Sequence, residues 1–113
     1  MTESFAASVQ LRENVAIVVL RGEINSAAEA ALNTAYAQAE AGNPQSILLD
    51  FQAVDYINST GIALIVGLLA QARKSHLRLV VCGLSEHYQE IFRITRLADF
   101  MQMYTDVTSA LAG

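Results

Sequence analysis

The chain has 113 residues, a formal net charge of −4 at pH 7 and an apolar fraction of 53%. This length suffices for one packed core and is too short for two, and the apolar fraction argues against a disordered segment. Lysine and arginine do not cluster along any one expected element, so the charge pattern of a nucleic-acid-binding protein is missing. We therefore expect one globular domain over residues 1–113 that does not bind nucleic acid.

The longest apolar runs are too short to cross a membrane. Residues 62–70 form such a run with a glycine inside it, whereas a spanning helix needs about 20 residues. The first residues also lack the basic and apolar regions of a signal peptide. The sequence therefore predicts a cytoplasmic protein without membrane insertion.

The N-terminal third predicts a β-hairpin followed by a helix. Weak alternation over residues 5–11 and a β-branched run over 15–20 indicate two antiparallel strands with a tight polar connection. Residues 21–25 are expected to break the second strand. Ser26 is then placed to cap an alanine-rich helix that runs to about residue 41.

The middle of the chain predicts a buried strand and a long apolar helix joined by a polar turn. The unbroken apolar run within residues 46–51 is typical of a strand covered on both faces, and residues 54–57 lead from it into the turn. The helix expected over 60–75 is apolar almost all round. We therefore expect it to lie deep in the domain, with Gly67 allowing a neighbour to approach closely.

The last third predicts a buried strand over 77–82, a helix capped by Ser85, a short strand over 101–104 and a C-terminal helix over 106–111. The apolar residues expected on the inner side of the middle helix are Ile91, Phe92 and Ile94. The order of elements predicts an α/β domain with a mixed, mostly parallel sheet, a leading antiparallel hairpin and about four helices.

Groups for catalysis or metal binding are few and scattered. His76, His87 and the carboxylates show neither clustering nor metal-ligand spacing, and Cys82 lies in an expected buried strand, where packing is its expected role. The glycines are isolated, so neither a Walker loop nor a dinucleotide-binding loop is present. We expect a protein that is not an enzyme and that holds no cofactor and no metal.

The most informative segment is the turn Ile57-Asn58-Ser59-Thr60-Gly61, which places hydroxyl groups at the start of the long helix. The free N–H groups and the macrodipole of a helix N-terminus stabilise an anion. A phosphoryl group on Ser59 would carry about 1.5–2 negative charges near neutral pH. The same residues also fit a plain cap, in which Asn58 or Ser59 accepts a hydrogen bond from the helix. The residues alone leave both interpretations open.

A second polar loop, Gly22-Glu23-Ile24-Asn25, follows the second expected strand. If the strands before the two loops are parallel neighbours, their carboxyl ends meet at one edge and the loops form one surface. Glu23 or Asn25 would then orient the Ser59 hydroxyl. The candidate partner-binding residues are Gly22, Glu23, Asn25, Asn58, Ser59, Thr60 and Gly61.

With these residues in view, the chain resembles the anti-sigma factor antagonists, the bacterial branch of the STAS domain family. The resemblance covers nearly the whole chain, and its most specific element is the serine turn with Gly61 and the apolar helix. It implies that Ser59 is phosphorylated by a partner that is both an anti-sigma factor and a serine kinase, with ATP bound by that partner. It further implies that the unphosphorylated chain binds this kinase and frees a sigma factor.

The chain departs from the family pattern at two positions, since Asn58 and Asn25 stand where the family often has aspartate. Both changes remove negative charge and keep a hydrogen-bonding side chain, which leaves phosphorylation efficiency open. The alternative function is a constitutive STAS scaffold, a subunit of a signalling or transport complex in which Ser59 only caps the helix. A small flavodoxin-like enzyme is a third class, disfavoured by the lack of catalytic groups. Thr60 is a secondary phosphorylation candidate, and the oligomeric state stays open.

Overall fold

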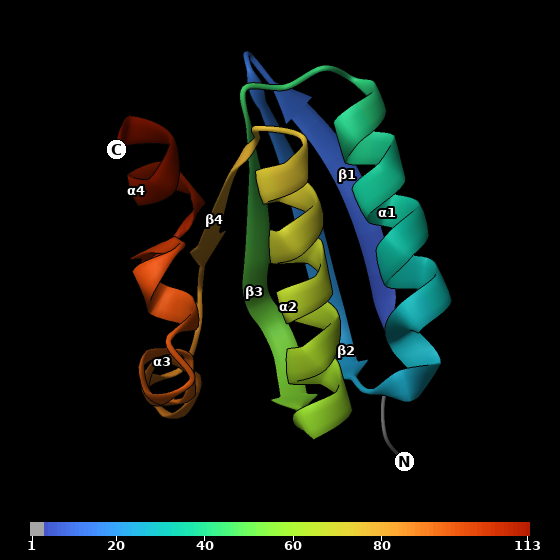
Figure 1. The fold of residues 1–113 in the computed structure, drawn as a ribbon, viewed down its shortest axis with the longest axis vertical. Coiled ribbons are helices and arrows are strands. Elements are labelled where there is room, and N and C mark those ends of the chain that lie inside the picture. Colours follow the sequence, from blue (N-terminus) through green and yellow to red (C-terminus); the bar gives the residue numbers. More distant parts are fainter. Residues whose placement is uncertain (1–3) are drawn as a thin grey trace.

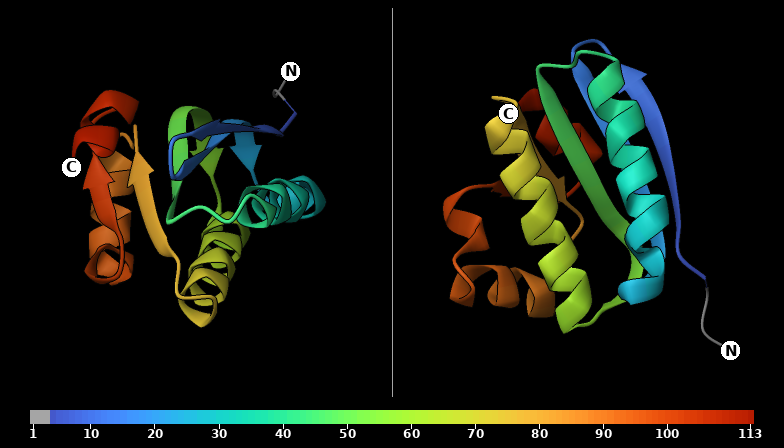
Figure 2. Two further views of the ribbon diagram at one scale, coloured as in Figure 1. Left: turned by 90° about the horizontal axis from the view of Figure 1, so that it is seen from above. Right: turned by 45° about the vertical axis from the view of Figure 1, so that its right-hand side comes forward.

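The computed structural model describes residues 4–113, which build a five-stranded sheet with helices on both faces (Figures 1 and 2). The strands, which neighbour one another in chain order, are β1 (Ala6–Arg12), β2 (Val15–Ile24), β3 (Ser46–Ile57), β4 (Arg78–Cys82) and β5 (Gln102–Tyr104). β1 pairs antiparallel with β2, and the remaining neighbours are parallel. The predicted mixed sheet with a leading hairpin is therefore confirmed.

The helices form two layers. The helical elements are η1 (Ser26–Ala28), α1 (Glu29–Ala41), α2 (Ser59–Lys74), α3 (Glu86–Ile94), η2 (Leu97–Asp99) and α4 (Val107–Ala112), where η marks a short 3-10 helix. In Figure 2, α1 and α2 cover one face of the sheet and α4 covers the other, while α3 lies beyond the carboxyl end of β4. None of the helices in residues 4–113 combines the length and apolar character that a bilayer crossing requires.

The two sheet faces bury separate apolar clusters, because side chains alternate between faces along a strand. The larger cluster lies between the sheet and α1, α2 and α3, and takes Ile47 and Leu49 from β3. The smaller cluster lies under α4 and takes Leu48 from β3, with Ile17 from β2. β3 is thus covered on both faces, as its unbroken apolar run predicts.

The second strand is longer than predicted. β2 does not break at residue 21 but continues to Ile24, with Arg21 paired to Ala53 and Gly22 paired to Val54 of β3. The register shifts on both sides of this pair, and Gly22 takes a φ of 89°. A glycine therefore bends the strand through an irregularity instead of ending it, because it reaches positive φ at little steric cost.

The predicted cap at Ser26 is also wrong by one residue. Asn25 has extended backbone angles, and its side-chain oxygen accepts a hydrogen bond from Ala27 N at 2.9 Å. This cap opens the 3-10 helix η1, from which α1 continues at Glu29. Asparagine and serine both make good caps, and the longer course of β2 places the cap at Asn25.

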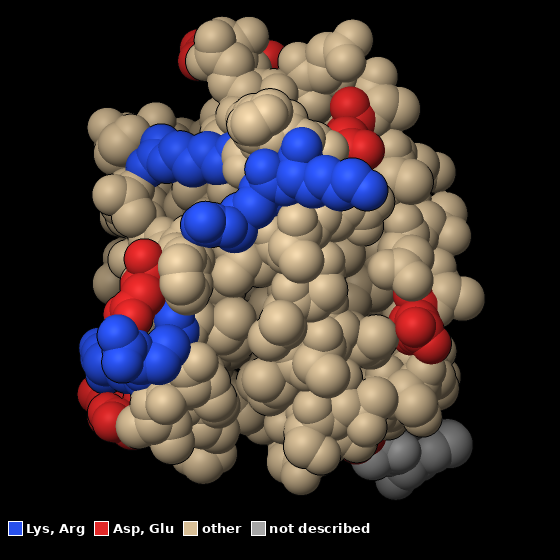
Figure 3. All heavy atoms as spheres, in the orientation of Figure 1, with Lys and Arg blue, Asp and Glu red and all other residues tan. Residues whose placement is uncertain are grey.

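Two apolar segments are less buried than predicted. α2 is not covered all round: Val66 is 46% exposed, and a Cβ at Gly67 would have no neighbouring atom within 4 Å. Ile94, at the end of α3, is 69% exposed. The sheet face under α2 has only one helical layer, so the outward side of α2 meets solvent. Figure 3 shows this face, which is uncharged along its middle and carries basic side chains near its upper edge.

We expect Gly67→Ala to raise the free energy of unfolding by about 0.5–1 kcal/mol, because alanine favours the helix and its methyl group enters open space. Urea denaturation followed by circular dichroism measures this. A lower stability than the parent chain would contradict the exposed position of Gly67.

Candidate partner-binding site at the serine turn

The serine turn is capped by Asn58 and not by Ser59. Asn58 has extended backbone angles, and its Oδ1 accepts a hydrogen bond from Gly61 N at 2.8 Å. Its carbonyl oxygen also accepts the bond from Ile62 N at 2.9 Å. Ser59 is the first residue of α2, and both Ser59 and Thr60 are exposed. The Ser59 hydroxyl is therefore free of the capping role that the residues alone had left open.

The turn is fixed in place by a close backbone contact between α2 and β2. The carbonyl oxygen of Ile24 accepts a hydrogen bond from Asn58 N at 3.2 Å. A Cβ built on Gly61 would lie 2.1 Å from that same oxygen and 2.8 Å from Ile57 Cγ2. Only glycine fits at this position, because any side chain would meet backbone that cannot move aside.

Parallel pairing brings the two polar loops to one edge of the sheet. Glu23 pairs with Tyr56, and Ile24 pairs with Ile57, so the loops continue from neighbouring positions. The predicted orienting role is not present, however. Asn25 Oδ1 is bonded to Ala27 N, and within residues 4–113 no hydrogen bond joins Glu23 or Asn25 to Ser59.

The candidate residues divide by exposure. Gly22 and Gly61 are buried, so they shape the two loops through their backbones. Glu23, Asn25 and Asn58 are half-buried, while Ser59 and Thr60 are exposed. A partner that approaches this edge therefore meets the two hydroxyl groups first.

Sequence reasoning missed Tyr56, which lies beside this edge and is 52% exposed. Its strand neighbour Ile57 is buried, and strand alternation therefore sends Tyr56 to the opposite face. An outward-facing aromatic side chain is typical of protein-binding surfaces. The signal was the alternation itself, since an inward Ile57 implies an outward Tyr56.

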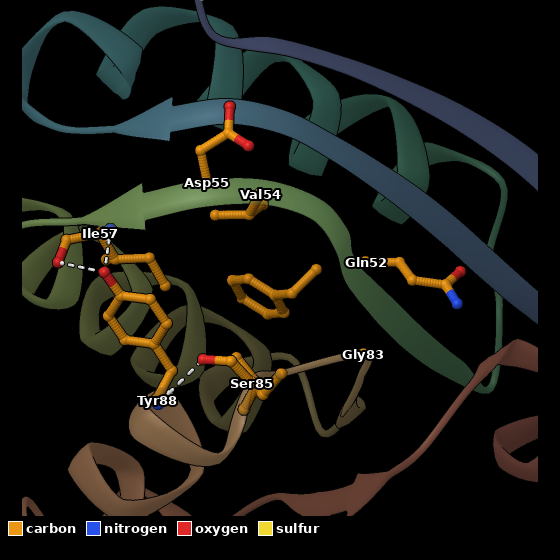
Figure 4. Close-up of a pocket in the computed structure, with 9 residues that line it drawn as sticks. Gln52, Val54, Asp55, Ile57, Gly83, Ser85 and Tyr88 are labelled. Atoms are coloured by element: carbon orange, nitrogen blue, oxygen red, sulfur yellow. Dashed lines mark hydrogen bonds between the residues drawn. The ribbon is translucent and has the colours of Figure 1, made fainter.

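Behind the turn, β3 extends beyond its neighbour β4. The pairing of these strands ends at Asp50 and Cys82, so no strand within residues 4–113 pairs with residues 51–57 on that side. Tyr88 of α3 completes the end of this edge, because its hydroxyl oxygen accepts from Ile57 N at 2.8 Å and its hydroxyl donates to Ile57 O at 3.4 Å (Figure 4). One buried phenol therefore satisfies both backbone groups just before the serine turn.

A cavity of about 170 Å³ lies between this edge of β3 and the start of α3. Its apolar walls include Phe51, Val54 and Leu84. Asp55 also lines it, but the carboxylate points away from the cavity in Figure 4. The cavity therefore lacks the paired acid and base groups that catalysis in a pocket requires.

Cys82 is a packing residue, as predicted. Its side chain is buried, and Sγ lies 3.6 Å from Asp50 Oδ1. Burial, together with the neighbouring Asp50 carboxylate, raises the pKa of the Cys82 thiol to about 12. The thiol stays protonated at neutral pH, and a protonated buried thiol is a poor nucleophile and metal ligand.

A model of the STAS domain matches residues 6–110. The chain belongs to the STAS domain family. BtrV of Bordetella bronchiseptica, which is named as an anti-sigma factor antagonist, is 30% identical over 83 residues, which is 74% of this STAS chain and 72% of BtrV. STAS anti-sigma factor antagonists are regulatory binding proteins, and this STAS domain is not an enzyme, as its residues predicted.

Solved structures share the STAS fold at low sequence identity. A Mycobacterium paratuberculosis anti-sigma factor antagonist has a TM-score of 0.81 and 21% identity, covering 96% of this chain and 92% of that chain. The phosphorylated form of the Bacillus protein SpoIIAA has a TM-score of 0.68 and 20% identity, covering 95% of this chain and 97% of SpoIIAA. A sulfate transporter family protein from Wolinella succinogenes has a TM-score of 0.78 and 17% identity, covering 91% and 86%.

We expect Tyr88→Phe to lower the free energy of unfolding by about 1–3 kcal/mol, because two buried backbone groups of Ile57 lose their partner. Tyr104→Phe is the matched control, since its hydroxyl bonds only the exposed side chain of Gln102. Urea unfolding of both variants makes the comparison, and equal losses would contradict the special role of Tyr88.

Gly61→Ala should lower the free energy of unfolding by about 1–3 kcal/mol, because its methyl group would overlap the Ile24 carbonyl. The effect is opposite in sign to that of Gly67→Ala in the same helix, which controls for helix propensity. Thermal or urea unfolding reports both, and a neutral Gly61→Ala would refute the tight contact.

Proposed function

We propose that this STAS domain is an anti-sigma factor antagonist that is switched by phosphorylation of Ser59. In the unphosphorylated form it binds an anti-sigma factor with serine kinase activity and frees a sigma factor in the cytoplasm. The observation that carries the proposal is the exposed Ser59 hydroxyl at the first position of α2, with the capping role taken by Asn58. The names of BtrV and of the structural neighbours support the same class.

The switch has a local physical basis. Asn58 Oδ1 engages the N–H of Gly61, which leaves the N–H groups of Ser59 and Thr60 ahead of the helical hydrogen-bond ladder. A phosphate on Ser59 would sit at the positive end of the α2 dipole, where an anion is stabilised without a change of fold. The added bulk and about 1.5–2 negative charges would alter the surface that the kinase contacts. Repulsion from the ATP phosphates held by the kinase would favour release.

Asn25 and Asn58 are compatible with this mechanism because each caps a helix as an aspartate would. Each uses its side-chain amide oxygen to accept a backbone hydrogen bond, Asn58 from Gly61 and Asn25 from Ala27. The loop geometry therefore does not require a carboxylate at either position. What changes is the charge beside the target hydroxyl, which bears on recognition by a cationic group of the kinase.

The proposal is tested by incubating the chain with ATP and the serine kinase encoded beside it, and mapping the product by mass spectrometry. We expect one phosphate on Ser59, retained in Thr60→Ala and lost in Ser59→Ala. The absence of phosphate from both Ser59 and Thr60 would contradict the switch.

A constitutive STAS scaffold is the second candidate, and the fold shared with a sulfate transporter family protein favours it. The same kinase or complex subunit can be bound to Ser59→Ala and Ser59→Asp in a calorimeter. Weaker binding of the Ser59→Asp variant, with the affinity of Ser59→Ala unchanged, supports the switch. Equal affinity of both variants and the parent supports the scaffold.

A further inference from the structure

The outward side of α2 forms an exposed surface that begins at Ser59 of the serine turn and runs along the helix. Among the exposed residues of this helix, six form one stripe, which we call the outer face of α2: Ser59, Ala63, Val66, Gly67, Ala70 and Lys74. In the left view of Figure 2, α2 stands out from the sheet beyond α1. The outward side of α2 is therefore open to a partner, together with the neighbouring exposed Phe100.

The outer face of α2 is apolar along its middle and basic at the C-terminal end of the helix. Val66 is 46% exposed and Phe100 is 53% exposed, and together with Leu69, Ala70 and Arg73 they line a shallow hollow. The Arg73 guanidinium lies 4.9 Å from the centre of the Phe100 ring. α2 contains no acidic residue, and its last turn carries Arg73 and Lys74. Figure 3 shows the uncharged middle and the basic edge on this side of the molecule.

The outer face is complementary to itself. In a two-fold antiparallel pair of α2 helices centred between Val66 and Gly67, Val66 lies opposite Gly67 of the second copy, where a Cβ would meet no atom. Ala63 then lies opposite Ala70, so the helix backbones can approach to about 8 Å. The same symmetry places Ser59 opposite Lys74 of the second copy, at both ends of the pair.

Charge decides when this pairing is favourable. In the unmodified chain, Lys74 would face the positive end of the opposing helix, which opposes association. The net charge of −4 on each copy opposes association in both states. A phosphate on Ser59 would instead contact Lys74 and Arg73 of the second copy. The two-fold symmetry repeats this contact at the other end of the pair. Phosphate–cation contacts of this kind are charge-assisted and strong.

We propose that phosphorylation of Ser59 pairs two copies of this chain through the outer face of α2. The inference rests on the Ser59 phosphorylation of the proposed function. It adds that a second copy of the chain binds the phosphorylated surface. In the paired form the serine turn of each copy is covered by the other. The phosphorylated chain is then kept from the kinase by its own partner copy as well as by repulsion.

The test uses protein with phosphoserine placed at position 59 by an expanded genetic code, so no kinase is needed. Sedimentation equilibrium should give a dimer dissociation constant at least about tenfold lower than that of the unmodified chain, an effect that weakens with salt. Gly67→Arg should abolish the dimer. Ala37→Arg, on the exposed side of α1, is the matched control and should leave it intact.

A charge exchange checks the register. Ser59→Glu should associate, Ser59→Glu with Lys74→Glu should not, and Ser59→Lys with Lys74→Glu should associate again. Equal association of the phosphoserine and unmodified chains, or a dimer insensitive to Gly67→Arg, would overturn the inference. If the encoded phosphoserine chain dimerises while the kinase leaves Ser59 unmodified, the pairing stands and the proposed switch fails.

Discussion

The contact between the Gly61 backbone and the Ile24 carbonyl oxygen joins the start of α2 to the end of β2, and it sets the geometry of the whole candidate site. No side chain fits there, since a Cβ would lie 2.1 Å from that oxygen. The same oxygen receives the N–H of Asn58. One carbonyl thus holds the cap and the first turn of the helix against a buried strand. The hydroxyl groups that follow the cap are presented to solvent from a rigid support.

Presentation of this kind suits a binding module better than a catalyst. The exposed groups at the turn are the Ser59 and Thr60 hydroxyls, and under the proposed function the chemistry would belong to another protein's active site. The residues that line the neighbouring cavity include no paired acid and base groups, and the buried Cys82 thiol remains protonated at neutral pH. Membership in the STAS family agrees with a role in binding and not in catalysis.

The two glycines of α2 serve opposite surfaces of the helix. Gly61 removes a side chain where the helix meets the sheet, whereas Gly67 leaves a gap on the outside, where nothing within the domain packs. Helix propensity alone disfavours both residues equally. Their positions link the two surfaces of α2, one fixing the serine turn and the other offering a self-complementary face along the same helix.

The sequence determined the order and type of the elements, because these follow from local patterns: the apolar run of β3, the hairpin, and the cap at Ser85, which the structure retains with a bond from Tyr88 N. It also located the serine turn at a strand end. It did not determine the course of β2 through Gly22, the cap at Asn25 or the exposure of α2, because each depends on which distant segment packs alongside. Tyr88 meets Ile57 across 31 positions of the chain, and only the folded sheet brings such groups together.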